Sequence, residues 1–143
     1  MVSGASAEWT TARGNAQRTG NLDGLAGPAK PKVLWSLRAP EQFISPPVPV
    51  GQRMFIGGLG AFNTGTLHCL ALDDAPNREL WAKAAPFIKR PTVCSPVVAG
   101  GLVIFGDGMH QTDDAILYAL HAETGQPVWQ LPLPGRLIHM EGS

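Results

Sequence analysis

The chain has 143 residues, 44% of them hydrophobic, and its 11 basic and 11 acidic residues give a formal net charge of zero. This balance argues against nucleic acid as the main partner, because phosphate binding requires a surplus of lysine and arginine. No apolar stretch reaches the roughly 18 residues of a membrane span, and no secretion signal is visible at the N-terminus. The 17 glycines and 13 prolines fall between short apolar runs, which predicts many short strands.

Residues 1–31 are expected to form an irregular lead-in, because they contain few apolar residues and show no sustained hydrophobic period. Trp9 is their one large aromatic residue. The run 32–37 is short, apolar and centred on Trp35, so we expect it to be the first strand.

From residue 44 onward the sequence repeats a pattern of four short apolar runs. Ser45 and Ser95 are 50 residues apart, and Trp81 and Trp129 are 48 apart. Repeats of about 40–50 residues with four strands each are typical of β-propeller blades. We therefore predict an all-β fold in which residues 32–143 form propeller repeats. These comprise a first four-stranded antiparallel blade at about 44–82, a second at about 94–131 and the start of a third at 139–143.

Other repeat architectures fit the sequence less well. No Trp-Asp dipeptide closes a strand, as WD40 repeats require, and the glycine doublets 57–58 and 100–101 fall at non-equivalent places, which disfavours kelch repeats. A β-sandwich fits the length but does not predict this repetition. Because a propeller closes with about four to eight blades, we expect the N-terminal piece of a longer, eight-bladed propeller, whose partners are the remaining blades.

Long loops predict where a ligand would bind. In an up-and-down blade alternate loops share a face, so loops 58–64, 84–93, 107–114 and 132–140 are expected to lie together. They exceed the hairpin norm of about two to five residues, and loops on a rigid scaffold often carry binding sites. We expect a protein or small-molecule ligand on this face.

The segment 107–114 is the sharpest candidate metal site. Oxygen and imidazole ligands from Asp107, His110, Asp113 and Asp114 would suit a hard cation such as calcium. Their spacing differs from the calcium-loop pattern Asp-x-Asp-x-Asp-Gly, so a solvated turn is the favoured interpretation.

Several other polar residues and both cysteines have ordinary structural interpretations. Arg136, His139 and Glu141 form a second polar cluster on the long-loop face. His68 and His121 are interpreted as structural histidines. Lys83, Lys89 and Arg90 are interpreted as a solvated basic surface. Cys69 and Cys94 are interpreted as small buried apolar residues.

Residues 117–129 form an apolar run, a Glu-Thr-Gly turn and a second run ending in Trp129. This stretch resembles the repeat of the pyrroloquinoline-quinone (PQQ) type propellers, Ala-x-Asp-x-x-Thr-Gly-x-x-x-Trp, whose tryptophan packs between neighbouring blades. His121 stands where the family prefers aspartate, and the first copy has a turn two residues longer without Thr-Gly. The resemblance implies these structural residues of the repeat: Trp35, Trp81, Trp129, Thr124 and Gly125.

The resemblance implies a fold more than a reaction, because the family includes quinoprotein dehydrogenases, assembly lipoproteins of the bacterial outer membrane and many uncharacterised proteins. The dehydrogenases are expected to stack a vicinal cysteine pair on the quinone and to hold calcium, whereas Cys69 and Cys94 are separated. We therefore expect a non-catalytic scaffold or binding module with no evident cofactor. The alternatives are part of a PQQ- and calcium-dependent dehydrogenase and an outer-membrane assembly factor. A periplasmic or envelope location is implied by the resemblance alone.

Overall fold

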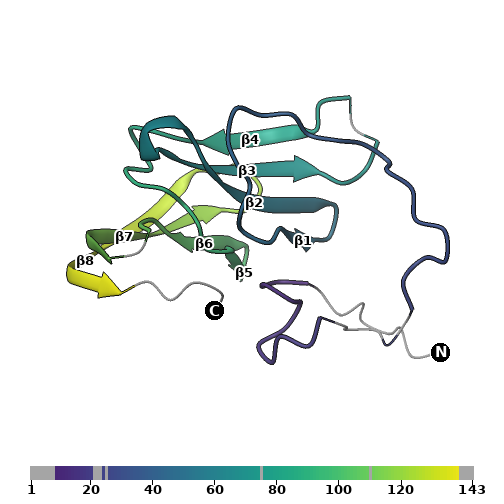
Figure 1. Ribbon diagram of the computed structural model, residues 1–143, viewed down its shortest axis with the longest axis horizontal. Coiled ribbons are helices and arrows are strands. Elements are labelled where there is room, and N and C mark those ends of the chain that lie inside the picture. The colour runs from purple at the N-terminus through teal and green to yellow at the C-terminus, as the bar shows by residue number, and fades with distance from the viewer. Residues whose placement is uncertain (1–8, 21–23, 25, 75, 110, 139–143) are drawn as a thin grey trace.

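A computed structural model describes residues 9–20, 24, 26–74, 76–109 and 111–138. They form two four-stranded antiparallel sheets with strands in sequence order (Figure 1). The first sheet contains β1 (Val48–Val50), β2 (Arg53–Leu59), β3 (Gly65–Ala71) and β4 (Glu79–Lys83), and a short 3-10 helix, η1 (Ala61–Asn63), links β2 to β3. The second contains β5 (Val97–Ala99), β6 (Leu102–Gly106), β7 (Gln111–His121) and β8 (Pro127–Ile138). The all-β prediction and its two blades are confirmed.

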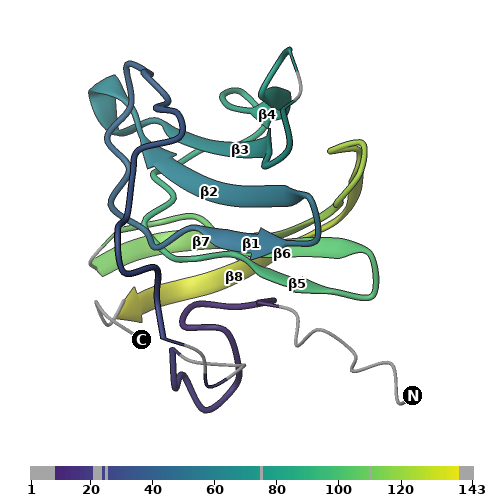
Figure 2. The same ribbon diagram turned by 90° about the vertical axis from the view of Figure 1, so that its right-hand side faces the viewer.

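The hydrophobic core lies between the two sheets, which stack face to face (Figure 2). Strand residues alternate between faces, so each sheet contributes every second side chain. Phe55 and Leu67 enter the core from the first sheet, and Phe105, Tyr118 and Leu120 enter from the second. The ring of Phe105 stacks on that of Tyr118 at 5.1 Å. None of the described residues belongs to a helix long and apolar enough to cross a bilayer.

The strand registers make the two sheets structurally equivalent. Val48, Phe55, Cys69 and Trp81 are successive cross-strand partners and therefore form one row across the first sheet. The corresponding row in the second sheet consists of Val97, Ile104, Ala119 and Trp129. The first row packs against the second sheet, but Val97 and Trp129 remain 43% and 37% exposed. We call the second row the outward row.

The structure corrects the repeat alignment by one residue. The Ser45 hydroxyl donates to the carbonyl oxygen of Gly57 at 3.2 Å, and the Cys94 thiol donates to Gly106 at 3.4 Å. Ser45 thus corresponds to Cys94, 49 residues later, and its alignment with Ser95 was wrong. Ser95 instead donates to the carbonyl oxygen of Pro46 at 2.9 Å, which ties the lead-ins of the two blades together.

The prediction of a strand at residues 32–37 is also wrong. This stretch has no strand assignment, and Val33 and Leu34 are 87% and 77% exposed. An extended segment becomes a strand only by pairing, and the described residues offer it no partner strand. The described part of the lead-in has no strand or helix, and its Trp9 packs against the core.

Two predicted loops are partly strands. Residues 111–114 belong to β7 and 132–138 to β8, and the two segments pair, with the register interrupted between Asp113 and Ala115. Residues 132–140 were expected to form a loop, but 132–138 are part of β8, an edge strand, which is where sheets tolerate proline. The prolines at 132 and 134 also limit further strand addition at that edge.

Candidate functional site: the boundary between the blades

Trp81 lies at the boundary between the blades. Its Nε1 donates a 3.1 Å hydrogen bond to the carbonyl oxygen of Ala122, in the turn between β7 and β8. A Cβ atom at Gly125 in the same turn would approach Trp81 Cδ2 to 2.7 Å. Gly125 also has a φ of 66°, a conformation that residues with a Cβ adopt at a cost. The indole therefore requires glycine at this position of the turn.

Trp35 makes a related contact one blade earlier. Its ring lies 4.8 Å from the guanidinium carbon of Arg78, in the turn between β3 and β4. Arg78 Nη1 also donates to the carbonyl oxygen of Asp73 at 2.6 Å. The first copy lacks Thr-Gly, and here an arginine over the indole face supplies the contact. In both blades a preceding tryptophan lies against the turn that joins the third and fourth strands.

The fourth tryptophan, Trp129, is the counterpart of Trp81 on the outward row. Thr124, which precedes Gly125, accepts a hydrogen bond from the backbone N–H of Gln126 at 3.3 Å and is exposed. Its role is local to the turn.

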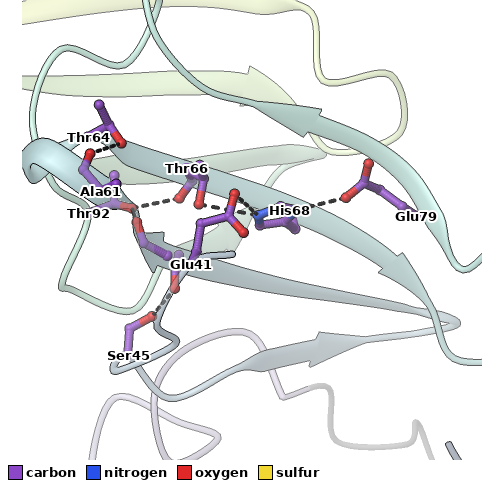
Figure 3. A network of polar contacts seen from close by, with 10 residues as sticks. Glu41, Ser45, Ala61, Thr64, Thr66, His68, Glu79 and Thr92 are labelled. Atoms are coloured by element: carbon purple, nitrogen blue, oxygen red, sulfur yellow. Dashed lines mark hydrogen bonds and ion pairs between the residues drawn. The ribbon is translucent and has the colours of Figure 1, made fainter. Parts of the chain in front are cut away.

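A buried polar network lies on the opposite face of the first sheet (Figure 3). His68, only 6% exposed, lies with Nδ1 2.8 Å from Glu79 Oε2 and with Nε2 3.2 Å from Thr66 Oγ1. Glu41 Oε1 is 3.9 Å from His68 Nε2, and the ring of Phe43 meets the imidazole edge-on. His68 thus anchors the chain that leads into the first blade, a structural role like the one inferred from the sequence.

Thr92 ties the chain segment between β4 and β5 to the first blade. Its Oγ1 lies 2.6 Å from the carbonyl oxygen of Thr66 and 3.1 Å from that of Gly58. A Cβ at Gly65 would lie 2.2 Å from the carbonyl oxygen of Arg90, so the segment crosses β3 in close contact. Sequence reasoning missed Thr92, because its partners are 26 and 34 residues away.

Asp107 of the predicted metal segment is a buried hydrogen-bond acceptor. Its Oδ1 accepts from the backbone N–H of Ile116 at 2.7 Å, and its Oδ2 accepts from the Tyr118 hydroxyl at 2.8 Å. Burial, followed by the hydrogen bond to Asp107, raises the pKa of the Tyr118 phenol. Asp113 and Asp114 are exposed, and His110 lies outside the described residues.

No group of three His, Cys, Asp or Glu side chains within the described part of the chain is arranged to hold a metal ion. The calcium site at 107–114 stays a prediction, because His110 lies outside the described residues.

The two cysteines lie on different elements and do not form a vicinal pair. Cys69 is fully buried in the core, and burial raises the pKa of its thiol from 9.0 to about 11 despite the opposing charge of Arg53. Cys94 is partly buried, with its thiol on the Gly106 carbonyl. The described residues therefore do not fit the quinone-stacking cysteine pair expected of the dehydrogenases.

The remaining candidates are dispersed over the molecule. His121 is exposed, and its backbone N–H donates to the carbonyl oxygen of Gln126 at 2.9 Å, which closes the β7–β8 turn. Arg90 Nη1 donates to the carbonyl oxygen of Asp114 at 2.8 Å. Lys89 is exposed and Lys83 partly exposed. The second predicted cluster has His139 and Glu141 outside the described residues, whereas the backbone of Arg136 pairs with Asp113.

A cleft of about 320 Å³ opens between the blades at the β1–β2 and β5–β6 turns. Figure 2 shows these turns at the end of the sheets opposite the β2–β3 and β6–β7 connections. The cleft therefore lies on the short-turn face. The sequence analysis expected a ligand on the opposite, long-loop face. Its walls include Val50, Phe55, Val98 and Ala122, and its polar groups come from Thr10 and Arg53.

Two successive four-stranded antiparallel blades, joined through tryptophan-to-turn contacts, define this chain as a β-propeller module. A family model described as "Outer membrane protein assembly factor BamB" matches residues 26–142. The chain belongs to this family of PQQ-type repeats, which confirms the resemblance seen in the sequence. No curated protein gives a significant match.

Proposed function

We propose that this protein is a non-catalytic β-propeller scaffold whose outward row stacks against a further blade. The observation that carries this proposal is the equivalence of the two cross-sheet rows. The row containing Phe55 and Trp81 is covered by the second sheet, whereas its counterpart, containing Val97 and Trp129, is partly exposed. A face with the equivalent register and a similar row of apolar side chains is suited to the same kind of neighbour.

The side chains that suggested chemistry also support a structural role. Asp107 accepts hydrogen bonds from Ile116 and Tyr118, and His68 contacts Thr66 and Glu79. These groups hold the blades in shape. Incubation with PQQ and calcium, followed by a dye-reduction assay with alcohols and sugars, tests this part of the proposal. We expect no turnover above the protein-free control; sustained turnover would favour the quinoprotein dehydrogenase alternative.

A role in outer-membrane protein assembly, in the periplasm or envelope, is the second candidate, favoured by the description of the matched family. Affinity purification from bacterial envelopes tests it, with Trp129→Ser as the matched control that alters the outward row. Specific recovery of outer-membrane barrel assembly proteins would support this role. Equal recovery by an unrelated propeller would argue against it.

A further inference from the structure

Arg53 stands out among the residues that line the cleft between the blades. It is the only charged side chain there within the described residues, and the other walls are mainly apolar. Its Nε atom is shielded from solvent and has no hydrogen-bond partner among the described residues. A buried donor without an acceptor is costly, and native proteins rarely leave one unpaired.

The nearest carboxylate among the described residues does not hydrogen-bond to Arg53. Arg53 Nη2 lies 3.9 Å from Glu123 Oε1, beyond hydrogen-bonding distance, and the Glu123 side chain is 79% exposed. An ion pair of this kind contributes little and is readily exchanged for a better one. The planar guanidinium presents donors in a fork that matches both oxygens of a carboxylate.

We propose that this cleft binds a small aliphatic carboxylate, with Arg53 holding the carboxylate and the apolar walls holding the tail. Val50, Phe55 and Val98 supply the apolar surface, and the volume of about 320 Å³ lies within the range of small-molecule sites. Thr10 also lines the cleft. Its backbone oxygen accepts from Val98 N–H at 2.8 Å, which keeps the N-terminal segment against β5. This proposal does not depend on the scaffold function.

Calorimetric titration of the full chain with hexanoate tests the proposal, and hexanamide and acetate serve as matched ligands. Hexanamide keeps the tail without the charge, and acetate keeps the charge without the tail. We expect saturable millimolar binding of hexanoate and at least about tenfold weaker binding of either comparison ligand, since a charge-assisted hydrogen bond and the buried methylenes each contribute to affinity. Equal binding of hexanoate and hexanamide, or no binding of hexanoate, would overturn the proposal.

Two substitutions provide opposite expectations for hexanoate affinity. Arg53→Gln should weaken binding at least about tenfold, because it removes the charge-assisted bonds. Glu123→Gln should strengthen binding by a few fold, because it removes the competing carboxylate from an exposed position. If Arg53 had only a structural role, the two substitutions would not shift the hexanoate affinity in opposite directions. If Arg53→Gln fails to fold, the Glu123→Gln titration still decides, and unchanged or weaker binding would overturn the proposal.

Discussion

Trp81 on β4 and Ala122 in the β7–β8 turn are joined by a 3.1 Å hydrogen bond from the indole Nε1 to the backbone carbonyl oxygen. The bond links the outer strand of one blade to a turn of the next, 41 residues later. Because the indole also packs with Phe55 at 5.9 Å, it combines apolar burial with a satisfied polar group. Disturbing this contact should therefore destabilise the boundary between the blades.

Gly125→Ala should lower the free energy of unfolding by about 2–4 kcal/mol, because it adds a steric clash to the cost of positive φ. The new Cβ would lie 2.7 Å from Trp81 Cδ2. Gly51→Ala is the matched control, since Gly51 has a φ of 56° and a Cβ added there would have no neighbour within 4 Å. It should cost only about 1–2 kcal/mol. Urea unfolding measures both, and equal losses would contradict the proposed contact.

Asp107→Ala should destabilise the second blade by about 2–4 kcal/mol, because the buried Ile116 N–H and Tyr118 O–H would lose their acceptor. Asp107→Asn keeps one carbonyl oxygen and should cost less. Thermal melts in calcium and in chelator separate this role from metal binding. We expect the same melting temperature in both buffers. A calcium-dependent increase that disappears in Asp113→Asn would instead support the metal hypothesis.

Alkaline pH should destabilise the fold through Cys69. Burial raises its thiol pKa from 9.0 to about 11, so between these values the unfolded chain loses the proton more readily than the folded one. The contribution of Cys69 to the free energy of unfolding is constant below pH 9 and declines as the pH rises towards 11. Urea midpoints across this range should fall less steeply for Cys69→Ala than for the parent or for Cys94→Ala. Identical slopes in all three proteins would contradict the assignment.

The sequence predicted the blade strands because their signals are local. The runs at 53–58, 102–106 and 117–120 are short, apolar and bounded by turn residues, and all three are strands. Residues 32–37 have the same local pattern but no pairing strand among the described residues. Residues 132–138 were predicted to be a loop, and only the sheet order shows that they belong to an edge strand, where proline is tolerated.

The site was less predictable, because its residues gain their roles through distant contacts. In the sequence Arg53 looks like an ordinary strand residue, and only the structure shows that it lines the cleft with an Nε that has no partner among the described residues. Asp107 was grouped with nearby acidic residues, whereas its partners are Ile116 and Tyr118 on the adjacent strand. The Trp81 contact was inferred from the repeat, but its acceptor at Ala122 was not.

Replacing Trp129 separates blade stacking from folding. Trp81→Ala should cost about 3 kcal/mol, near the low end for large aromatic residues because its indole is only partly buried. Trp129 is 37% exposed on the outward row. Trp129→Ala should therefore cost less stability than Trp81→Ala, but it should weaken association between chains. Urea unfolding and sedimentation velocity measure the two effects. Equal stability losses with unchanged association would contradict the distinction.

Light scattering on the purified 143-residue chain tests the stacking role of the outward row most directly. The partly exposed apolar row favours association between chains. We predict poor solubility, or oligomers in which blades of separate copies stack; a closed eight-bladed ring would contain four copies. Trp129→Ser should shift the distribution towards smaller species. A monodisperse monomer that melts cooperatively would show that the two blades are complete alone, and would contradict the proposal.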